Sequence, residues 1–182
     1  MYPIRHVESS HRPIYLGRPP GQSTRTDRLN SEAVQWEQPA QPPAGAQAKW
    51  PVVLPADPPI RVLLADDNRS SRHLLHTLLT RWGMDVECAV DGLDAWEALH
   101  RVPFEMVVSD IEMPRWSGNQ LVASMRKSLV PSLRNMPVIL VSSLSPEAVV
   151  REFSHWNGLY FIQRPIELAE LVDMLRLATG RS

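Results

Sequence analysis

The chain has 182 residues, of which 43% are hydrophobic and 21% charged, so it is long enough for one globular domain and an additional segment. The formal net charge of −1 argues against a protein that binds nucleic acid directly through general electrostatic attraction. No uninterrupted apolar stretch approaches the ~18 residues of a membrane span, and the amino terminus lacks the apolar core of a secretory signal. We therefore expect a soluble cytoplasmic protein without a membrane partner. The single cysteine, Cys88, cannot form an internal disulfide, and its apolar neighbours predict a small core residue.

Residues 1–59 differ in composition from the rest of the chain. They contain 11 of the 17 prolines. Proline at this density opposes regular helix and sheet, and the segment has few apolar residues whose burial could offset the entropy lost on ordering. We predict that residues 1–59 form a disordered proline-rich tail and linker.

From residue 60 onwards, short apolar runs alternate with amphipathic helical patterns. The runs predict buried strands, and the segments between them predict helices because their apolar residues recur every three or four positions. Five such units in succession predict an α/β fold, a doubly wound five-stranded parallel sheet of the flavodoxin-like (βα)5 type, formed by residues 60–182. The predicted strands are residues 60–65, 84–90, 106–109, 136–141 and 159–163.

Three carboxylates follow two of these strands. Asp66 and Asp67 come after the first strand and Asp110 after the third. Because the carboxyl ends of parallel strands meet at one edge of the sheet, we expect these side chains to converge there. Converging carboxylates repel each other unless a cation binds them, and Mg²⁺ accepts carboxylate, water and phosphoryl oxygens. The alternative is local: Asp110 would only cap the next helix, and the Asp pair would only form a solvated turn.

Two further residues at the same edge suit phosphoryl transfer. Ser142 follows the fourth strand and Arg164 the fifth. Phosphoryl transfer needs an in-line nucleophile, a divalent metal ion and groups that neutralise the equatorial oxygens. Asp110 could attack as a carboxylate, Ser142 could donate a hydrogen bond, and Arg164 could neutralise charge through two N–H groups. Each residue alone is weak evidence, but their order and strand-end positions together favour such a site.

The residues around these positions form recognisable motifs. They are Leu-Leu-Ala-Asp66-Asp67-Asn, Val-Asp91-Gly92, Ser-Asp110-Ile-Glu-Met-Pro114 with Gly118, Pro-Val-Ile-Leu-Val-Ser142-Ser143, and Arg164-Pro165. With these motifs, residues 60–180 resemble the receiver domain of two-component response regulators. The resemblance implies a (βα)5 fold, bound Mg²⁺ and phosphorylation of Asp110 by the phosphohistidine of a sensor histidine kinase or phosphotransfer protein.

The resemblance also implies roles for single residues. Asp66, Asp67 and Asp110 would hold the metal, helped by the backbone carbonyl of Glu112. Ser142 takes the place of the family's switch threonine or serine. Phe161 takes the place of its switch aromatic residue.

Arg164 departs from the family, which nearly always has lysine at this position before a cis proline. We expect Pro165 to follow a cis peptide bond as well. Arginine keeps the charge and can bind phosphate through two N–H groups, but it is bulkier and planar. It could therefore serve the phosphoryl group, or it could occupy the pocket and pair permanently with Asp110.

These two roles of Arg164 predict two functions. In the first, the chain is a stand-alone response regulator receiver of a phosphorelay, a phosphoacceptor signalling protein rather than a turnover enzyme. In the second, it is a degenerate pseudo-receiver that binds proteins independently of phosphorylation. Only a few residues follow the last predicted helix, so we expect output through a downstream protein partner rather than through a DNA-binding domain. The predicted contact surface is the face of the fourth helix, the fifth strand and the fifth helix, with Trp156 partly exposed.

Two other classes of protein share parts of this pattern. A flavodoxin-like mononucleotide binder would need a loop rich in Gly, Ser and Thr after the first strand, where this chain has Asp66 and Asp67. A phosphohydrolase with an aspartyl nucleophile would need a general acid two residues after Asp110. Glu112 stands there, but the other motifs of such enzymes are missing from the sequence.

Overall fold

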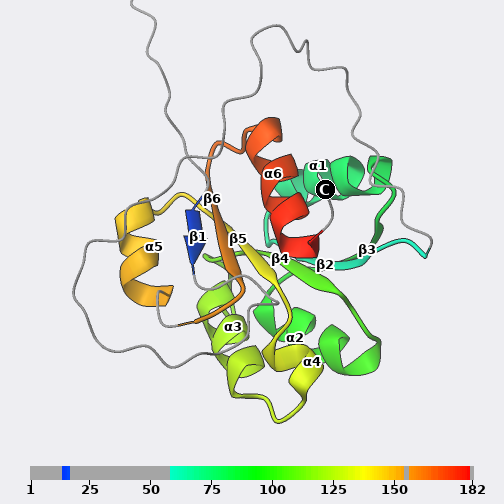
Figure 1. The fold of residues 1–182 in the computed structure, drawn as a ribbon, viewed down its shortest axis with the longest axis vertical. Coiled ribbons are helices and arrows are strands. Elements are labelled where there is room, and N and C mark those ends of the chain that lie inside the picture. Colours follow the sequence, from blue (N-terminus) through cyan, green and yellow to red (C-terminus); the bar gives the residue numbers. More distant parts are fainter. Residues whose placement is uncertain (1–13, 17–57, 154–155, 181–182) are drawn as a thin grey trace, which may run out of the picture.

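The computed structural model describes residues 14–16, 58–153 and 156–180 (Figure 1). Five strands form the predicted parallel sheet in the spatial order β3-β2-β4-β5-β6, which confirms the doubly wound (βα)5 fold class. β3 lies on one side of β2, whereas β4, β5 and β6 lie on the other, so the strand order reverses between β2 and β4. Open α/β sheets bind ligands at such a switch point. The strands are β2 (Arg61–Ala65), β3 (Asp85–Ala89), β4 (Met106–Asp110), β5 (Val138–Ser142) and β6 (Leu159–Gln163).

Helices cover both faces of the sheet because successive strand residues point to opposite sides. Val62 and Leu64 pack in a core with α1 and α6, whereas Leu63 and Ala65 pack in a second core with α2, α3 and α5. Within the described residues, no helix has the length and apolar composition to cross a membrane. The helices of these two layers are α1 (Arg69–Arg81), α2 (Gly92–Arg101), α3 (Gly118–Lys127), α5 (Pro146–Phe153) and α6 (Leu168–Thr179).

Polar caps fix the starts of α1, α2 and α3. The side chains of Asn68, Asp91 and Ser117 accept hydrogen bonds from the first N–H groups of α1, α2 and α3. Asn68 follows Asp67 directly, so α1 begins as soon as β2 has ended. This short connection places the first turn of α1 beside the strand-end carboxylates.

A sixth strand, β1 (Ile14–Leu16), pairs antiparallel with β6. The prediction that residues 1–59 are disordered is therefore wrong for these three residues. The physical reason is that the outer side of β6 is a sheet edge, whose free backbone groups can bind an extended apolar segment. Other residues of the predicted tail, up to residue 57, lie outside the described part of the chain, so the domain boundary at residue 60 stays a prediction.

The structure also tests three local predictions, which concern the segment before β5, Cys88 and the peptide bond before Pro165. A short helix, α4 (Pro131–Arg134), precedes β5 where no helix was predicted. Cys88 is exposed, so its prediction as a core residue is wrong. It lies on β3, an edge strand of the described sheet, and strand order cannot be deduced from an apolar run alone. The predicted cis peptide bond before Pro165 is confirmed.

Gly118 provides a test of how closely α3 approaches the end of β4. A Cβ atom at Gly118 would lie 2.3 Å from the carbonyl oxygen of Asp110, far inside van der Waals contact with a backbone atom. We expect Gly118→Ala to lower the free energy of unfolding by about 1–3 kcal/mol, because the helix or the strand end must shift. Urea denaturation would measure this loss. Lys127→Ala, an exposed change in the same helix, should stay within about 0.5 kcal/mol of the unchanged protein, and an equal loss in both variants would contradict the prediction.

Candidate functional site

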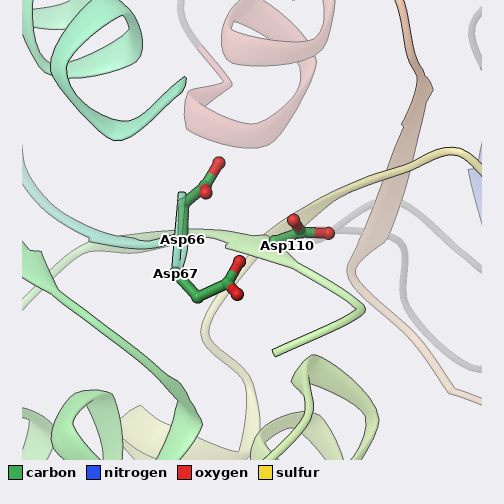
Figure 2. Close-up of side chains that lie close together, drawn as sticks. All are labelled: Asp66, Asp67 and Asp110. Carbon is green, nitrogen blue, oxygen red and sulfur yellow. The ribbon is translucent and has the colours of Figure 1, made fainter. Parts of the chain in front are cut away.

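The carboxylates of Asp66, Asp67 and Asp110 lie together at the carboxyl edge of the sheet (Figure 2). Asp66 and Asp67 directly follow β2, and Asp110 is the last residue of β4. One oxygen atom from each carboxylate lies within 4.8 Å of the others. Asp66 is buried and Asp110 partly buried, whereas Asp67 is exposed. The strands therefore bring the three predicted carboxylates together and leave one of them open to solvent.

The guanidinium group of Arg164 lies against two of these carboxylates. Its Nη2 atom is 2.8 Å from Oδ2 of Asp66 and 3.1 Å from Oδ2 of Asp110. The Arg164 side chain is only 26% exposed, so water and salt screen these ion pairs less than at the surface. Burial raises the pKa of Asp110, and the positive charge of Arg164 partly offsets that rise. Arg164 therefore favours the ionised form of Asp110, the form that can act as a nucleophile.

Ser71, in the first turn of α1, joins this cluster and was not predicted from the sequence. Its hydroxyl group donates a hydrogen bond to Oδ2 of Asp66 at 2.6 Å and accepts one from Nη1 of Arg164 at 2.8 Å. Arg72, the next residue, donates from its Nη1 to the backbone carbonyl of Asp66. The only sequence feature that could have indicated Ser71 is its spacing of one helical turn from the helix start, which is common among serines without any such role.

The remaining predicted site residues lie at different distances from the cluster. The backbone N–H of Glu112 donates to Oδ1 of Asp110 at 3.2 Å, which fixes the loop after β4 against that carboxylate. Ser142, the buried last residue of β5, accepts the N–H of Leu144 through its Oγ at 3.0 Å, and its hydroxyl donates to no acceptor among the described residues. Phe161 lies inside β6 and packs in the core on the α2, α3 and α5 side. The structure does not bring Phe161 to the carboxylates.

An ion pair holds the loop between β4 and α3 against the start of α2. Arg115, which has a positive φ of 56°, pairs through its Nε with the buried carboxylate of Asp91. The N–H of Gly92 also donates to the carbonyl oxygen of Trp116 at 2.9 Å. Burial alone would raise the pKa of Asp91, but hydrogen bonds from the Asp94 N–H and from Arg115 hold it below its ordinary value. These contacts stabilise the loop that also carries Glu112.

The donor atoms of this cluster fit a hard divalent cation. Asp66, Asp67 and Asp110 offer carboxylate oxygens only, with no sulfur or imidazole ligand, and this is the set that Mg²⁺ prefers. Such an ion uses few protein ligands and keeps several waters, which the exposure of Asp67 permits. Asp66 and Asp110 are the same two carboxylates that Arg164 contacts, so the site already binds positive charge at this point.

Comparisons with known proteins agree with this geometry. Residues 62–176 match the family model described as the response regulator receiver domain. The chain is 34% identical over 123 residues to the transcriptional regulatory protein TctD of Salmonella typhimurium, an alignment that covers 68% of this chain and 53% of TctD. It is 29% identical over 147 residues to the two-component response regulator-like protein APRR3 of Arabidopsis thaliana, over 80% of this chain and 29% of APRR3. The chain thus spans about half the length of TctD and less than a third of APRR3.

Solved structures show the same fold. The receiver domain of a histidine kinase from Syntrophus aciditrophicus is 28% identical, with a TM-score of 0.58 over 66% of this chain and 90% of that chain. The receiver domain of the sensor histidine kinase PA1611 from Pseudomonas aeruginosa is 21% identical, with a TM-score of 0.59 over 67% of this chain and 98% of that chain. That second structure holds a magnesium ion coordinated in its active site cleft. At 21% identity the likeness shows the fold alone.

Asp67 provides a test of the metal-binding prediction. We expect Mg²⁺ to bind the unchanged protein weakly and Asp67→Ala to raise the Kd for Mg²⁺ by more than ~10-fold, because one of three converging carboxylates is lost. A titration with Mg²⁺ followed by NMR or by tryptophan fluorescence would measure the affinity. Asp173→Asn removes an exposed carboxylate in α6 and should leave the affinity unchanged. Equal affinity in the Asp67→Ala variant would place the metal elsewhere.

Proposed function

Because the chain belongs to the response regulator receiver domain family, we propose that Asp110 accepts a phosphoryl group from the phosphohistidine of a sensor histidine kinase or phosphotransfer protein. The observation that carries this proposal is the position of Asp110 at the end of β4, beside two further carboxylates and one guanidinium group. A lone strand-end aspartate would support only a helix cap. The cluster of carboxylates beside the Arg164 guanidinium group supports a site that binds Mg²⁺ and a phosphoryl group.

The proposed reaction exchanges one bond to phosphorus for another. A carboxylate oxygen of Asp110 attacks the phosphorus atom, the phosphorus–nitrogen bond to the donor histidine breaks, and an aspartyl phosphate forms. Mg²⁺, held by Asp66, Asp67, Asp110 and the backbone carbonyl of Glu112, would neutralise the negative charge that gathers there. A protein of the same fold, the PA1611 receiver domain, holds a magnesium ion in its active site cleft.

The chain's own residues supply the remaining contacts to the phosphoryl group. Arg164 would turn from Asp66 and Asp110 towards the new phosphoryl oxygens, to which its planar group can donate two hydrogen bonds. The hydroxyl proton of Ser142 is free to donate, because its Oγ uses only a lone pair for Leu144. These contacts exist only after transfer, so they can report that phosphorylation has occurred.

We propose further that the signal leaves through protein contacts on α5, β6 and α6. Ser142 would move towards the phosphoryl group, Phe161 in the neighbouring strand β6 would follow, and the face formed by these elements would change its preferred arrangement. Trp156, which follows α5 in the sequence, is partly buried against the core and would belong to this face. A downstream protein partner would read this face.

The contacts of Arg164 favour a second candidate function. In the described structure its guanidinium group holds Asp66, Ser71 and Asp110 at once. If these contacts persist, Asp110 cannot approach a phosphorus atom in line. The chain would then act as a pseudo-receiver that binds its partner whether or not a phosphodonor is present.

Labelling with a small phosphodonor distinguishes the two functions. We expect incubation with acetyl phosphate and Mg²⁺ to add roughly 80 Da to the protein, the mass of one phosphoryl group, and Asp110→Asn to abolish the gain. Intact mass spectrometry would measure it. Asp173→Asn, the same change at an exposed site in α6, should label as the unchanged protein does.

Arg164→Lys completes this test. If Arg164 serves the phosphoryl group, labelling should continue at an equal or higher rate in Arg164→Lys, because lysine keeps the charge. If Arg164 locks Asp110, the unchanged protein should resist labelling and Arg164→Lys should restore it. With Mg²⁺ shown to be bound, labelling of neither protein would refute phosphate acceptance at Asp110.

A further inference from the structure

The outer edge of β6 is covered by a segment from the opposite end of the sequence. β1 pairs antiparallel with β6 in the register Ile14–Phe161, Tyr15–Tyr160 and Leu16–Leu159. Figure 1 shows β1 between α5 and β6, and α5 contacts it. Without β1, β6 would be the last strand on this side of the described sheet.

The hydrogen bonds of β6 identify which of its backbone groups β1 covers. Gly158 accepts the N–H of Val138 in β5, and the N–H of Arg164 donates to Ser142 in β5. Because backbone groups alternate sides along a strand, Tyr160 and Ile162 also face β5, whereas Leu159 and Phe161 face outwards to β1. The pairs Ile14–Phe161 and Leu16–Leu159 are therefore the hydrogen-bonded pairs of this ladder.

β1 is poorly suited to be a permanent strand. It has three residues, fewer than the ~5–6 of a typical strand. Pro13 precedes it, and Gly17 and the prolines at 19–20 follow it, and both residue types are depleted in strands. It forms only two hydrogen-bonded residue pairs with β6. It nevertheless covers an edge that would otherwise present free N–H and C=O groups beside an apolar core.

We infer that the outer edge of β6 is a docking site for an extended peptide segment, and that the chain closes this site with its own residues Ile14–Leu16. A partner that adds an apolar strand antiparallel to β6 binds by the backbone pairing that β1 now makes, so it must displace β1. Residues 17–60 connect β1 to β2 and keep it at high local concentration, which raises the affinity that a competing strand needs. The segment thus acts as an autoinhibitory cover of this edge.

Amide hydrogen exchange in the full chain tests whether β1 is the cover. Leu16→Pro removes an N–H donor of the ladder and fixes φ. We expect the amides of Leu159 and Phe161 to exchange at least ~10-fold faster in this variant, whereas those of Tyr160 and Ile162, which face β5, keep their rates. His11→Pro, the same kind of change outside β1, should match the unchanged protein. Equal exchange of Leu159 and Phe161 in all three proteins would overturn the inference.

A peptide in trans tests whether the uncovered edge is a docking site. The probe is a fluorescent peptide of residues 10–20 of this chain, and anisotropy measures its binding to the full-length proteins. We expect Leu16→Pro to bind the peptide at least ~10-fold more tightly than the unchanged protein or His11→Pro, because the competitor in cis is gone.

Ile14→Pro, which removes the other inward-facing donor, should give the same gain, and the thermal midpoint of each variant shows that the domain is folded. Equal affinity for all proteins, or no binding to either strand variant, would overturn the docking site. No measurement here involves Asp110, so the result is independent of phosphorylation.

Discussion

The convergence of carboxylates at one edge of a parallel sheet is the constraint on which the rest of this site depends. Ala65 and Ser109 lie opposite each other in the β2–β4 ladder, so the next residues, Asp66 and Asp110, must end side by side. Two carboxylates in a partly buried position destabilise each other unless positive charge lies between them. Arg164 meets this need from the end of β6, two strands from β4, because its long side chain and planar group contact both carboxylates with a single nitrogen atom.

Such a cluster adds little net stability to the fold, because the cost of desolvating charges offsets most of their attraction. The two apolar cores on either side of the sheet provide the stability that the site uses. Around the cluster, the chain relies on close backbone packing and local polar contacts. Gly118 lets α3 begin against the carbonyl of Asp110, and the Asp91–Arg115 ion pair holds the intervening loop to α2. Removing one partner of a buried pair would cost more than the pair contributes, since the other charge would stay buried alone.

Most of the fold and the centre of the site could be predicted from the sequence, for physical reasons that also explain the misses. Apolar runs followed by carboxylates specify both the strands and the edge at which Asp66 and Asp110 meet. Ser71 could not be predicted, because its role depends on the conformation of the Arg164 side chain. Cys88 was misplaced because an apolar run does not reveal which strand lies at the edge of the sheet. β1 was missed because three apolar residues in a proline-rich segment gain order only from the edge they bind.

The contacts of Arg164 also bear on how a metal ion would enter. Its Nη2 atom contacts Asp66 and Asp110, two of the carboxylates that would hold Mg²⁺, so the guanidinium group and the metal would compete for the same negative charge. A lysine would carry its charge at one nitrogen atom, whereas the guanidinium group of Arg164 has a second terminal nitrogen, Nη1, which donates a hydrogen bond to Ser71 on α1. The hydrogen bond from Nη1 to Ser71 could therefore persist while Nη2 moves away from Asp110. A phosphoryl group on Asp110 would bring enough negative charge for both cations, so the ion pair seen here is compatible with a resting state as well as with a permanent lock.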